Sequence, residues 1–257
     1  MTDPADAPAA EPRDHKPARD EMRGRVILVT GAGDGIGRAV ALALAEHGAT
    51  LILGGRTTRK LEKTYDDILA GGGAKPSIAP LNLEKALAPD YDAVATGIEK
   101  EYGRLDGLLH NAGILGQLSP IEHYDVPTWC RVLHVNLTAA FALTQVCLPM
   151  LKNSADAAVL FTSSSVGRKG RALWGAYAAS KFATEGLAQV LADETRALGR
   201  LRVNCINPGP TRTAMRLQAY PAENREALRE PASLVNAYLF LLGPASRGIT
   251  GRSFDAQ

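Results

Sequence analysis

Residues 25–48 read RVILVTGAGDGIGRAVALALAEHG, and this stretch decides the fold. The β-branched run at 25–30 predicts a buried strand, the glycines of 31–37 predict a tight turn, and the alanine-rich run from Arg38 predicts a helix that ends at Gly48. Glycines let the backbone approach an anion closely, and the free N–H groups at a helix start point toward it. Strand, glycine turn and helix in this order indicate a site for the pyrophosphate of a dinucleotide.

The next predicted strand, residues 50–53, ends in Gly54-Gly55-Arg56. An acidic residue at the end of this strand would hold the ribose hydroxyls and select NAD, but Gly55 stands there. Without that carboxylate there is room for a 2′-phosphate, and the Arg56 guanidinium can pair with one. We therefore expect NADP(H) as cofactor, with NAD(H) the less favoured choice. Asp34, inside the glycine turn, argues mildly against this, and Arg56 as a solvated loop cation remains the alternative.

A second group of residues suits proton transfer. Ser164 is followed thirteen residues later by Tyr177, and Lys181 lies one helical turn beyond it in a segment that predicts a helix. A free tyrosine has a pKa near 10. We expect the neighbouring ammonium of Lys181 to lower that pKa and Ser164 to hold a substrate oxygen against the phenol. Tyr-x-x-x-Lys alone is common on helix faces, so the upstream dinucleotide turn is what gives it weight.

Strands and helices alternate along the rest of the chain. This alternation predicts an α/β fold: a single domain with a doubly wound, Rossmann-like parallel sheet of about seven strands and helices on both faces. Ligands in such sheets bind at the carboxyl ends of the strands. The further strands are expected at 78–83, 105–110, 159–162 and 201–206, with a short edge at 250–254, and the further helices at 88–102, at 127–150 and around Tyr177.

Together these residues resemble the short-chain dehydrogenase/reductase family in its Tyr-x-x-x-Lys form, over residues 24 to 257, and within it the YciK-like bacterial subgroup. The resemblance implies the catalytic set Asn136, Ser164, Tyr177 and Lys181, with Asn136 holding a water in a proton relay. It also implies these cofactor contacts besides Tyr177 and Lys181: Gly31, Gly33, Asp34, Gly35, Ile36, Gly37, Arg56, Asn82, Leu83, Asn111, Ala112, Gly113, Pro208, Gly209, Thr211 and Thr213.

The same resemblance implies hydride transfer between NADP(H) and a small-molecule carbonyl or alcohol, with no natural substrate identified. The sequence departs from the family at Asn82, which replaces an aspartate, at His110, which replaces an asparagine, and at the ending Asp255-Ala-Gln. A non-catalytic NADP(H)-binding sensor and an NAD-dependent alcohol dehydrogenase remain alternatives. Relatives commonly form homodimers or homotetramers, and we expect one of these states.

Composition limits the partners. The 257 residues are 46% hydrophobic and 22% charged, with a net charge of +2 and no basic cluster, so we expect no nucleic-acid partner. We expect no membrane span, no metal site and free thiols at the three cysteines, as in a cytoplasmic protein. Residues 1–22 are rich in Pro, Ala, Asp and Glu and predict a disordered tail before a domain at 23–257.

The substrate side is left open. Arg168, Lys169 and Arg171 would suit an anionic substrate or would simply be solvated loop cations. Trp174 would stack on a flat substrate or would merely pack. The segment 215–229 has the composition of a lid over the cleft.

Overall fold

Seven parallel strands form one sheet in the order β3-β2-β1-β4-β5-β6-β7. The structure, a computed structural model, describes residues 11–257. The chain steps outward from β1 to β3 and then returns to the other side of β1 with β4, so the strand order reverses between β1 and β4, where an open α/β sheet has its ligand crevice. The strands are β1 (Val26–Thr30), β2 (Thr50–Gly55), β3 (Ser77–Pro80), β4 (Gly107–His110), β5 (Ala157–Thr162), β6 (Leu201–Asn207) and β7 (Ser253–Asp255).

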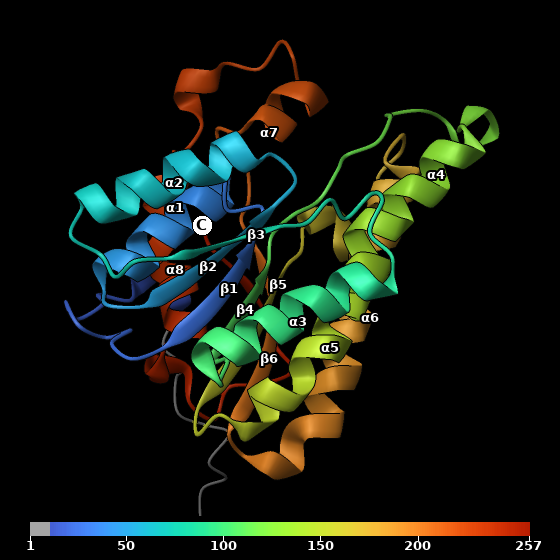
Figure 1. Cartoon of the computed structure of the whole chain (residues 1–257). Coiled ribbons are helices and arrows are strands. Elements are labelled where there is room, and N and C mark those ends of the chain that lie inside the picture. Colours follow the sequence, from blue (N-terminus) through green and yellow to red (C-terminus); the bar gives the residue numbers. More distant parts are fainter. Residues whose placement is uncertain (1–10) are drawn as a thin grey trace, which may run out of the picture.

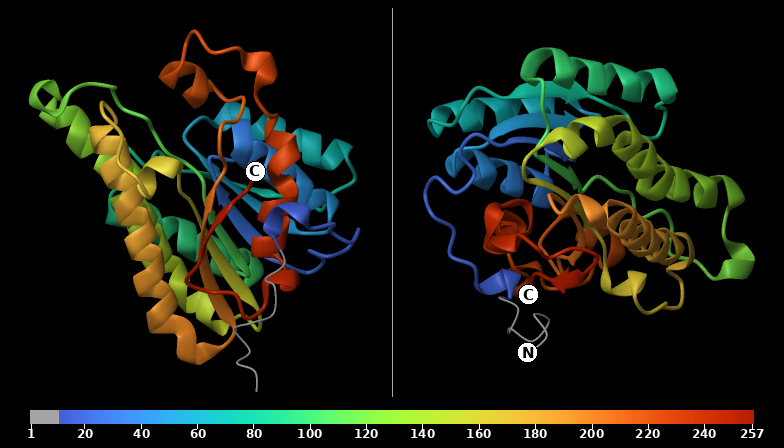
Figure 2. Two further views of the ribbon diagram at one scale, coloured as in Figure 1. Left: turned by 180° about the vertical axis from the view of Figure 1, so that it is seen from behind. Right: turned by 90° about the horizontal axis from the view of Figure 1, so that it is seen from below.

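Helices cover both faces of the sheet, as the doubly wound prediction requires (Figure 1 and, in two further views, Figure 2). One face carries α1 (Gly35–Glu46), α2 (Thr58–Ala70) and α8 (Val235–Leu242), and the other carries α3 (Ala88–Tyr102), α5 (Ala139–Asn153) and α6 (Gly175–Thr195). Two apolar clusters, one on each face, form the core. Because β1, β4 and β5 are covered on both faces, their residues are buried without alternation.

Two strands differ from the prediction in their bounds. We expected a strand at 78–83, but β3 ends at Pro80, whose ring nitrogen has no hydrogen to donate to a ladder. After Pro80, Leu81 keeps one backbone hydrogen bond to β2, and the chain then leaves the sheet; Leu81, Asn82 and Leu83 line the cleft. The edge strand expected at 250–254 is β7 at 253–255, because it begins only where the chain pairs with Cys205 of β6.

The long helix expected at 127–150 is interrupted. It consists of α4 (Val126–Leu133), a π-helical turn at His134–Thr138, and α5. Single π turns inside α-helices recur at functional sites because they re-aim side chains, and Asn136 lies in this one. By length and composition the whole helix could cross a membrane, but Leu143, Cys147 and Leu151 are buried in the core.

Residues 11–22 pack on the domain, which differs from the disorder expected for 1–22. Met22 is fully buried, and its amide donates to the carbonyl of His47. The His15 ring contacts Phe240 of α8 and bonds to Glu21. Composition alone predicts disorder for this segment. The core residues around Met22 come from distant parts of the sequence, so no local pattern indicates that it packs there. The rest of that prediction, on 1–10, lies outside the described residues.

Cysteine burial also differs in part. Cys147 and Cys205 are buried free thiols, as expected, but Cys130 on α4 is exposed.

Candidate active site

The glycine turn between β1 and α1 lies at the point of strand reversal. Gly31 and Gly35 have φ angles of +71° and +50°, which favour glycine. A Cβ on Gly37 would lie 2.3 Å from the carbonyl oxygen of Gly31, so only glycine lets the helix start lie this close to the turn. Both observations fit a backbone cradle for a pyrophosphate at the N-terminus of α1.

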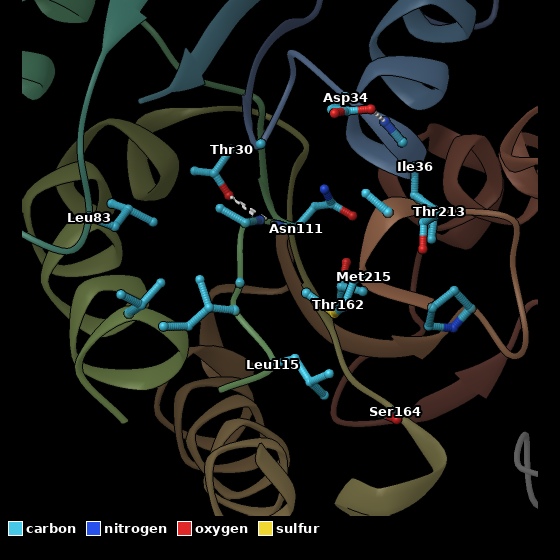
Figure 3. A pocket seen from close by; sticks show the side chains of 18 of the residues that line it. Thr30, Asp34, Ile36, Leu83, Asn111, Leu115, Thr162, Ser164, Thr213 and Met215 are labelled. Atoms are coloured by element: carbon cyan, nitrogen blue, oxygen red, sulfur yellow. Dashed lines mark hydrogen bonds between the residues drawn. The ribbon is translucent and has the colours of Figure 1, made fainter. Parts of the chain in front are cut away.

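Thr30 fastens this turn to the next strand. Its hydroxyl accepts hydrogen bonds from the amides of Asn111 (3.0 Å) and Ala112 (3.1 Å) and donates to the carbonyl of Leu109 (3.1 Å). Figure 3 shows Thr30 among the residues that line the pocket, directed at Asn111. The hydroxyl therefore holds the ends of β1 and β4 in register, which sets the position of the segment Asn111–Gly113.

Lys60 and Arg56 lie at the end of the cleft where the adenosine is expected. Lys60 of α2 pairs with Asp34 at 2.5 Å, and this bond together with the amide of Gly35 lowers the pKa of the Asp34 carboxyl. Arg56, which follows β2, is about two-thirds exposed and approaches Glu84 only to 3.9 Å. The negative charge of Asp34 is thus offset by Lys60, while the Arg56 guanidinium stays available to an anion.

The segment after β3 forms the neighbouring wall. The amide of Leu81 donates to the carbonyl of Gly55 (3.0 Å), which continues the link to β2 beyond the last strand residue. The side-chain oxygen of Asn82 accepts a hydrogen bond from the amide of Glu84 (3.2 Å), so this oxygen is occupied within its own turn. Leu83 points into the cavity (Figure 3).

Asn136 is fixed by the π turn. Its side chain accepts from the amide of Ile114 (2.8 Å) and donates to the Ile114 carbonyl and to the hydroxyl of Ser180 (both 3.0 Å). It is buried and does not line the cavity. A Cβ on Gly113 would lie 3.2 Å from its oxygen, so the amide supports the β4 loop directly behind the cleft.

Tyr177 and Lys181 lie one turn apart on α6, both buried. Burial raises the pKa of Tyr177 to about 12, and a hydrogen bond with Ser164 opposes that rise. The expected lowering by Lys181 is wrong for this structure: the ammonium lies 5.6 Å from the ring centroid and donates to the carbonyl of Thr162 (2.6 Å). Burial lowers the pKa of Lys181 itself to about 8.

His110, which stands where the family has an asparagine, lies beneath this pair. Its ring stacks on Phe161 of β5 at 4.7 Å and bonds to Thr144 (2.8 Å). Burial and the nearby charge of Lys181 lower its pKa to about 3. The imidazole is therefore neutral and is packed in the interior against Phe161 and Thr144, without lining the cavity.

The loop after β6 closes the other side. Gly209 has a φ of +68°, and Thr213 caps α7 (Ala214–Ala219) by accepting from the amide of Arg216 (3.1 Å). Thr213 also lies 3.4 Å from the position of a Cβ on Gly35, so this loop meets the glycine turn. Gln257 holds the loop from outside, donating to the carbonyls of Pro208 (2.5 Å) and Pro210 (3.0 Å).

One cavity of about 960 Å³ joins these parts. Of the predicted site residues, all but Gly37 and Asn136 line it; those two support it from behind. Lys60 was not among the predicted residues, because no helix was predicted over 58–70 and nothing in the sequence placed its side chain at the cleft. Gln257 was also missed, because its role depends on contacts between distant segments. Met215 and Tyr220 line the cavity and lie in the segment 215–229 that was expected as a lid. Figure 3 shows Met215 and Leu115 directed into the cavity.

Comparisons with known proteins agree with this geometry. A family model described as short chain dehydrogenase matches residues 25–224. The chain is 50% identical over 243 residues to YciK of Escherichia coli K12, an oxidoreductase whose activity is uncharacterized, covering 95% of this chain and 96% of that one.

Solved structures superpose closely. The crystal structure of YciK from E. coli gives a TM-score of 0.92 at 50% identity, covering 95% of this chain and 99% of that chain. A short-chain dehydrogenase-like protein of Shigella flexneri 2a, solved in complex with NADP, gives a TM-score of 0.91 at 50% identity, covering 93% and 100% of the two chains.

Proposed function

The chain belongs to the short-chain dehydrogenase family, and from this membership we propose that it reduces a carbonyl compound with NADPH, or oxidises the corresponding alcohol with NADP⁺. It is an oxidoreductase by family. The NADP and NADPH complexes of relatives near 50% identity support this cofactor. So does the free guanidinium of Arg56 beside the neutralised Asp34.

One observation carries the proposal. The glycine cradle and the set of Ser164, Tyr177 and Lys181 line a single cavity, with Thr213 beside the turn. A pyrophosphate over the cradle leaves the catalytic hydroxyls at the far end of the same space. A dinucleotide is the ligand whose length and charge suit both ends.

The chain's own residues would supply the proton half of the reaction, while NADPH, when bound, supplies the hydride. Ser164 would donate a hydrogen bond to the carbonyl oxygen and hold it at the phenol of Tyr177. With a pKa raised by burial, Tyr177 is protonated at neutral pH and is set to act as general acid. Lys181, still a cation below pH 8, would favour the phenolate that forms. Asn136 would keep the proton path behind Gly113 in place.

Substitution of Tyr177 by Phe tests this assignment. It keeps the ring and deletes the proton, so we expect kcat to fall about 10²–10⁴-fold with NADPH affinity nearly unchanged. The assay is oxidation of NADPH with a panel of aldehydes, ketones and quinones. Tyr65→Phe on α2, outside the cavity, is the matched control. Turnover that survives in Tyr177→Phe would refute the role of the phenol, whereas a wild type that binds NADPH and reduces nothing would favour a sensor.

The assembly and location are also proposals. Phe141 of α5 and Phe182 and Val190 of α6 are about half exposed on neighbouring helices, an apolar surface that suits pairing of two copies. We propose a homodimer or homotetramer in the cytoplasm, where the three free thiols stay reduced. Light scattering after size exclusion measures the state.

A further inference from the structure

Three cations follow the catalytic serine, and the structure gives them different surroundings. Arg168 pairs with Glu185 (3.5 Å) and Asp255 (3.0 Å), which ties α6 to β7 away from the cavity. Lys169 is exposed and does not line the cavity. Arg171 does line it. Of these three cations, therefore, only Arg171 is placed where it could bind an anionic substrate.

Arg171 has no carboxylate within ion-pair distance among residues 11–257. Its guanidinium donates to the hydroxyl of Tyr220 (2.6 Å), a neutral acceptor. Arg216, the other arginine on this side, stacks on the Tyr220 ring at 3.9 Å and is neutralised by Glu223. Arg171 thus lies at the cavity wall, exposed to solvent, with no carboxylate of residues 11–257 offsetting its charge.

The carboxylates that line the cavity lie at its opposite end. Within the described chain they are Asp34 and Glu84, which belong to the glycine turn and the segment after β3. Lys60 holds the first, and Arg56 and Arg131 approach the second. The end that faces the substrate is therefore positive, and no fixed carboxylate of residues 11–257 there would repel an anion.

Between the phenol of Tyr177 and Arg171 the wall is aromatic. Trp174 contacts the Tyr177 ring edge-on at 5.7 Å and the Tyr220 ring at 5.8 Å. Leu115, Val166 and Met215 add apolar surface to the same cluster and line the cavity. A flat apolar body fits along this wall.

The wall contains one strained residue that its neighbours hold. Leu173 has a φ of +74°, the sole such value for a non-glycine residue in the described chain. Its carbonyl accepts from the amide of Ser119 (3.0 Å), and Ser119 pairs with Trp174 in a β-bridge. Strained residues of this kind persist where the surroundings hold them and are frequent at ligand sites. Here the contacts with Ser119 hold Leu173 in this conformation, and they place the Trp174 ring beside the catalytic tyrosine.

We propose that this cavity selects carbonyl substrates that carry a carboxylate at the far end of a flat apolar body, and that Arg171 pairs with that carboxylate. The proposal rests on the reductase function above. The carbonyl carbon would gain hydride from NADPH and its oxygen a proton from Tyr177, while the carboxylate stays unchanged. The planar guanidinium would exchange the neutral Tyr220 hydroxyl for a charged acceptor, which forms the stronger hydrogen bonds.

The experiment compares acids with their methyl esters. NADPH oxidation is measured with 4-formylbenzoate and 4′-formylbiphenyl-4-carboxylate and with both esters, in wild type, Arg171→Gln and Arg171→Lys. We expect the wild type to prefer the acids by about 10–100-fold in kcat/KM, Arg171→Gln to lose most of that preference and Arg171→Lys to keep part of it. Lys169→Gln is the control, with the preference intact. Taking the acid-to-ester ratio cancels effects common to both substrates.

A purely structural role for Arg171 is separated by Tyr220→Phe. If Arg171 only anchors Tyr220, both variants change the acid-to-ester ratio alike, and the proposal is overturned. If Arg171 binds the substrate, Tyr220→Phe keeps the preference, because the carboxylate replaces the lost acceptor. A wild type that reduces acids and esters equally well also overturns it, while leaving the reductase function intact.

If none of these carbonyls is reduced, the reductase function fails for them. Binding measurements then test whether the cavity prefers a carboxylate to a neutral group. Calorimetric titration of the NADP⁺-loaded protein with 2-naphthoate and 2-naphthamide then provides the readout. Tighter binding of naphthoate that disappears in Arg171→Gln supports the carboxylate site. Equal binding of the two compounds, or no binding, overturns it.

Discussion

Substitution of Arg56 by Ala measures how much of the cofactor preference this one guanidinium provides. In NADPH the 2′-phosphate would lie at the end of β2, where Gly55 leaves space and Arg56 begins the connection to α2. Glu84 competes weakly at 3.9 Å and is shared with Arg131 at 3.7 Å. Arg56 therefore gives up little when it turns to a phosphate.

The magnitude depends on the charge and its exposure. Hydrogen bonds to charged groups contribute about 1.5–3 kcal/mol, but exposed ion pairs are screened to about 0.2–1 kcal/mol. With its side chain 64% exposed, Arg56 lies between these cases. About 1–2 kcal/mol corresponds to a rise of roughly 5–30-fold in the Kd for NADPH. The Kd for NADH, which lacks the phosphate, should rise far less.

Fluorescence titration of both nucleotides at two salt concentrations is the assay. The wild-type preference for NADPH should shrink at higher salt because the pair is exposed. Arg59→Ala, an exposed arginine of α2 outside the cavity, is the control. Equal losses for NADPH and NADH in Arg56→Ala would contradict the reasoning, since they would mean that Arg56 acts on a part that both nucleotides share.

Three further predictions concern groups around the cavity. Burial lowers the pKa of Lys181 to about 8, so carbonyl reduction should decline as pH rises through 8 and the ammonium is lost; a kcat/KM profile that stays flat to pH 10 contradicts this. Burial lowers the pKa of His110 to about 3, so between pH 6.5 and 3 the unfolded chain binds more protons than the folded one, and stability falls as the pH falls. In urea unfolding, the stability of His110→Asn should fall less steeply with pH. An equally steep fall would contradict this prediction. Gln257→Ala frees the loop at 208–211 and should raise the Kd for NADPH about 3–10-fold in titrations, whereas an unchanged Kd would mean that the loop is held without it.

The sheet was predictable because its strands are buried on both faces. Continuous apolar runs such as 26–29 and 51–53, separated by helical patterns, allow few arrangements other than a parallel sheet. The glycine turn and Ser164 follow strand ends directly, where the fold places ligands. Tyr177 and Lys181 were inferred from their spacing on the helix that comes next. The predicted bounds of a strand were wrong where a single residue sets them: β3 ends at Pro80, whereas the strand was expected to reach residue 83.

Electrostatic detail was not predictable from spacing. Four residues of separation place Lys181 on the same helix face as Tyr177, and from this we expected a lowered tyrosine pKa. The spacing says nothing of burial, which raises that pKa, or of the Thr162 carbonyl, which takes the ammonium's hydrogen bond. The π turn at Asn136 was hidden for a similar reason, because it changes the hydrogen-bond pattern without changing the apolar pattern.

The two ends of the cavity differ in what fixes them, and this explains why the cofactor was easier to infer than the substrate. The cofactor end is built on strand termini and a hydroxyl, Thr30, that joins two neighbouring strands. The substrate end depends on Leu173, Trp174 and Tyr220, which are held by contacts between segments far apart in sequence. One of these residues, Leu173, has a strained backbone. Such a wall is free to vary without disturbing the sheet. Arg171 therefore carries information about this chain's own substrate that the family pattern does not contain.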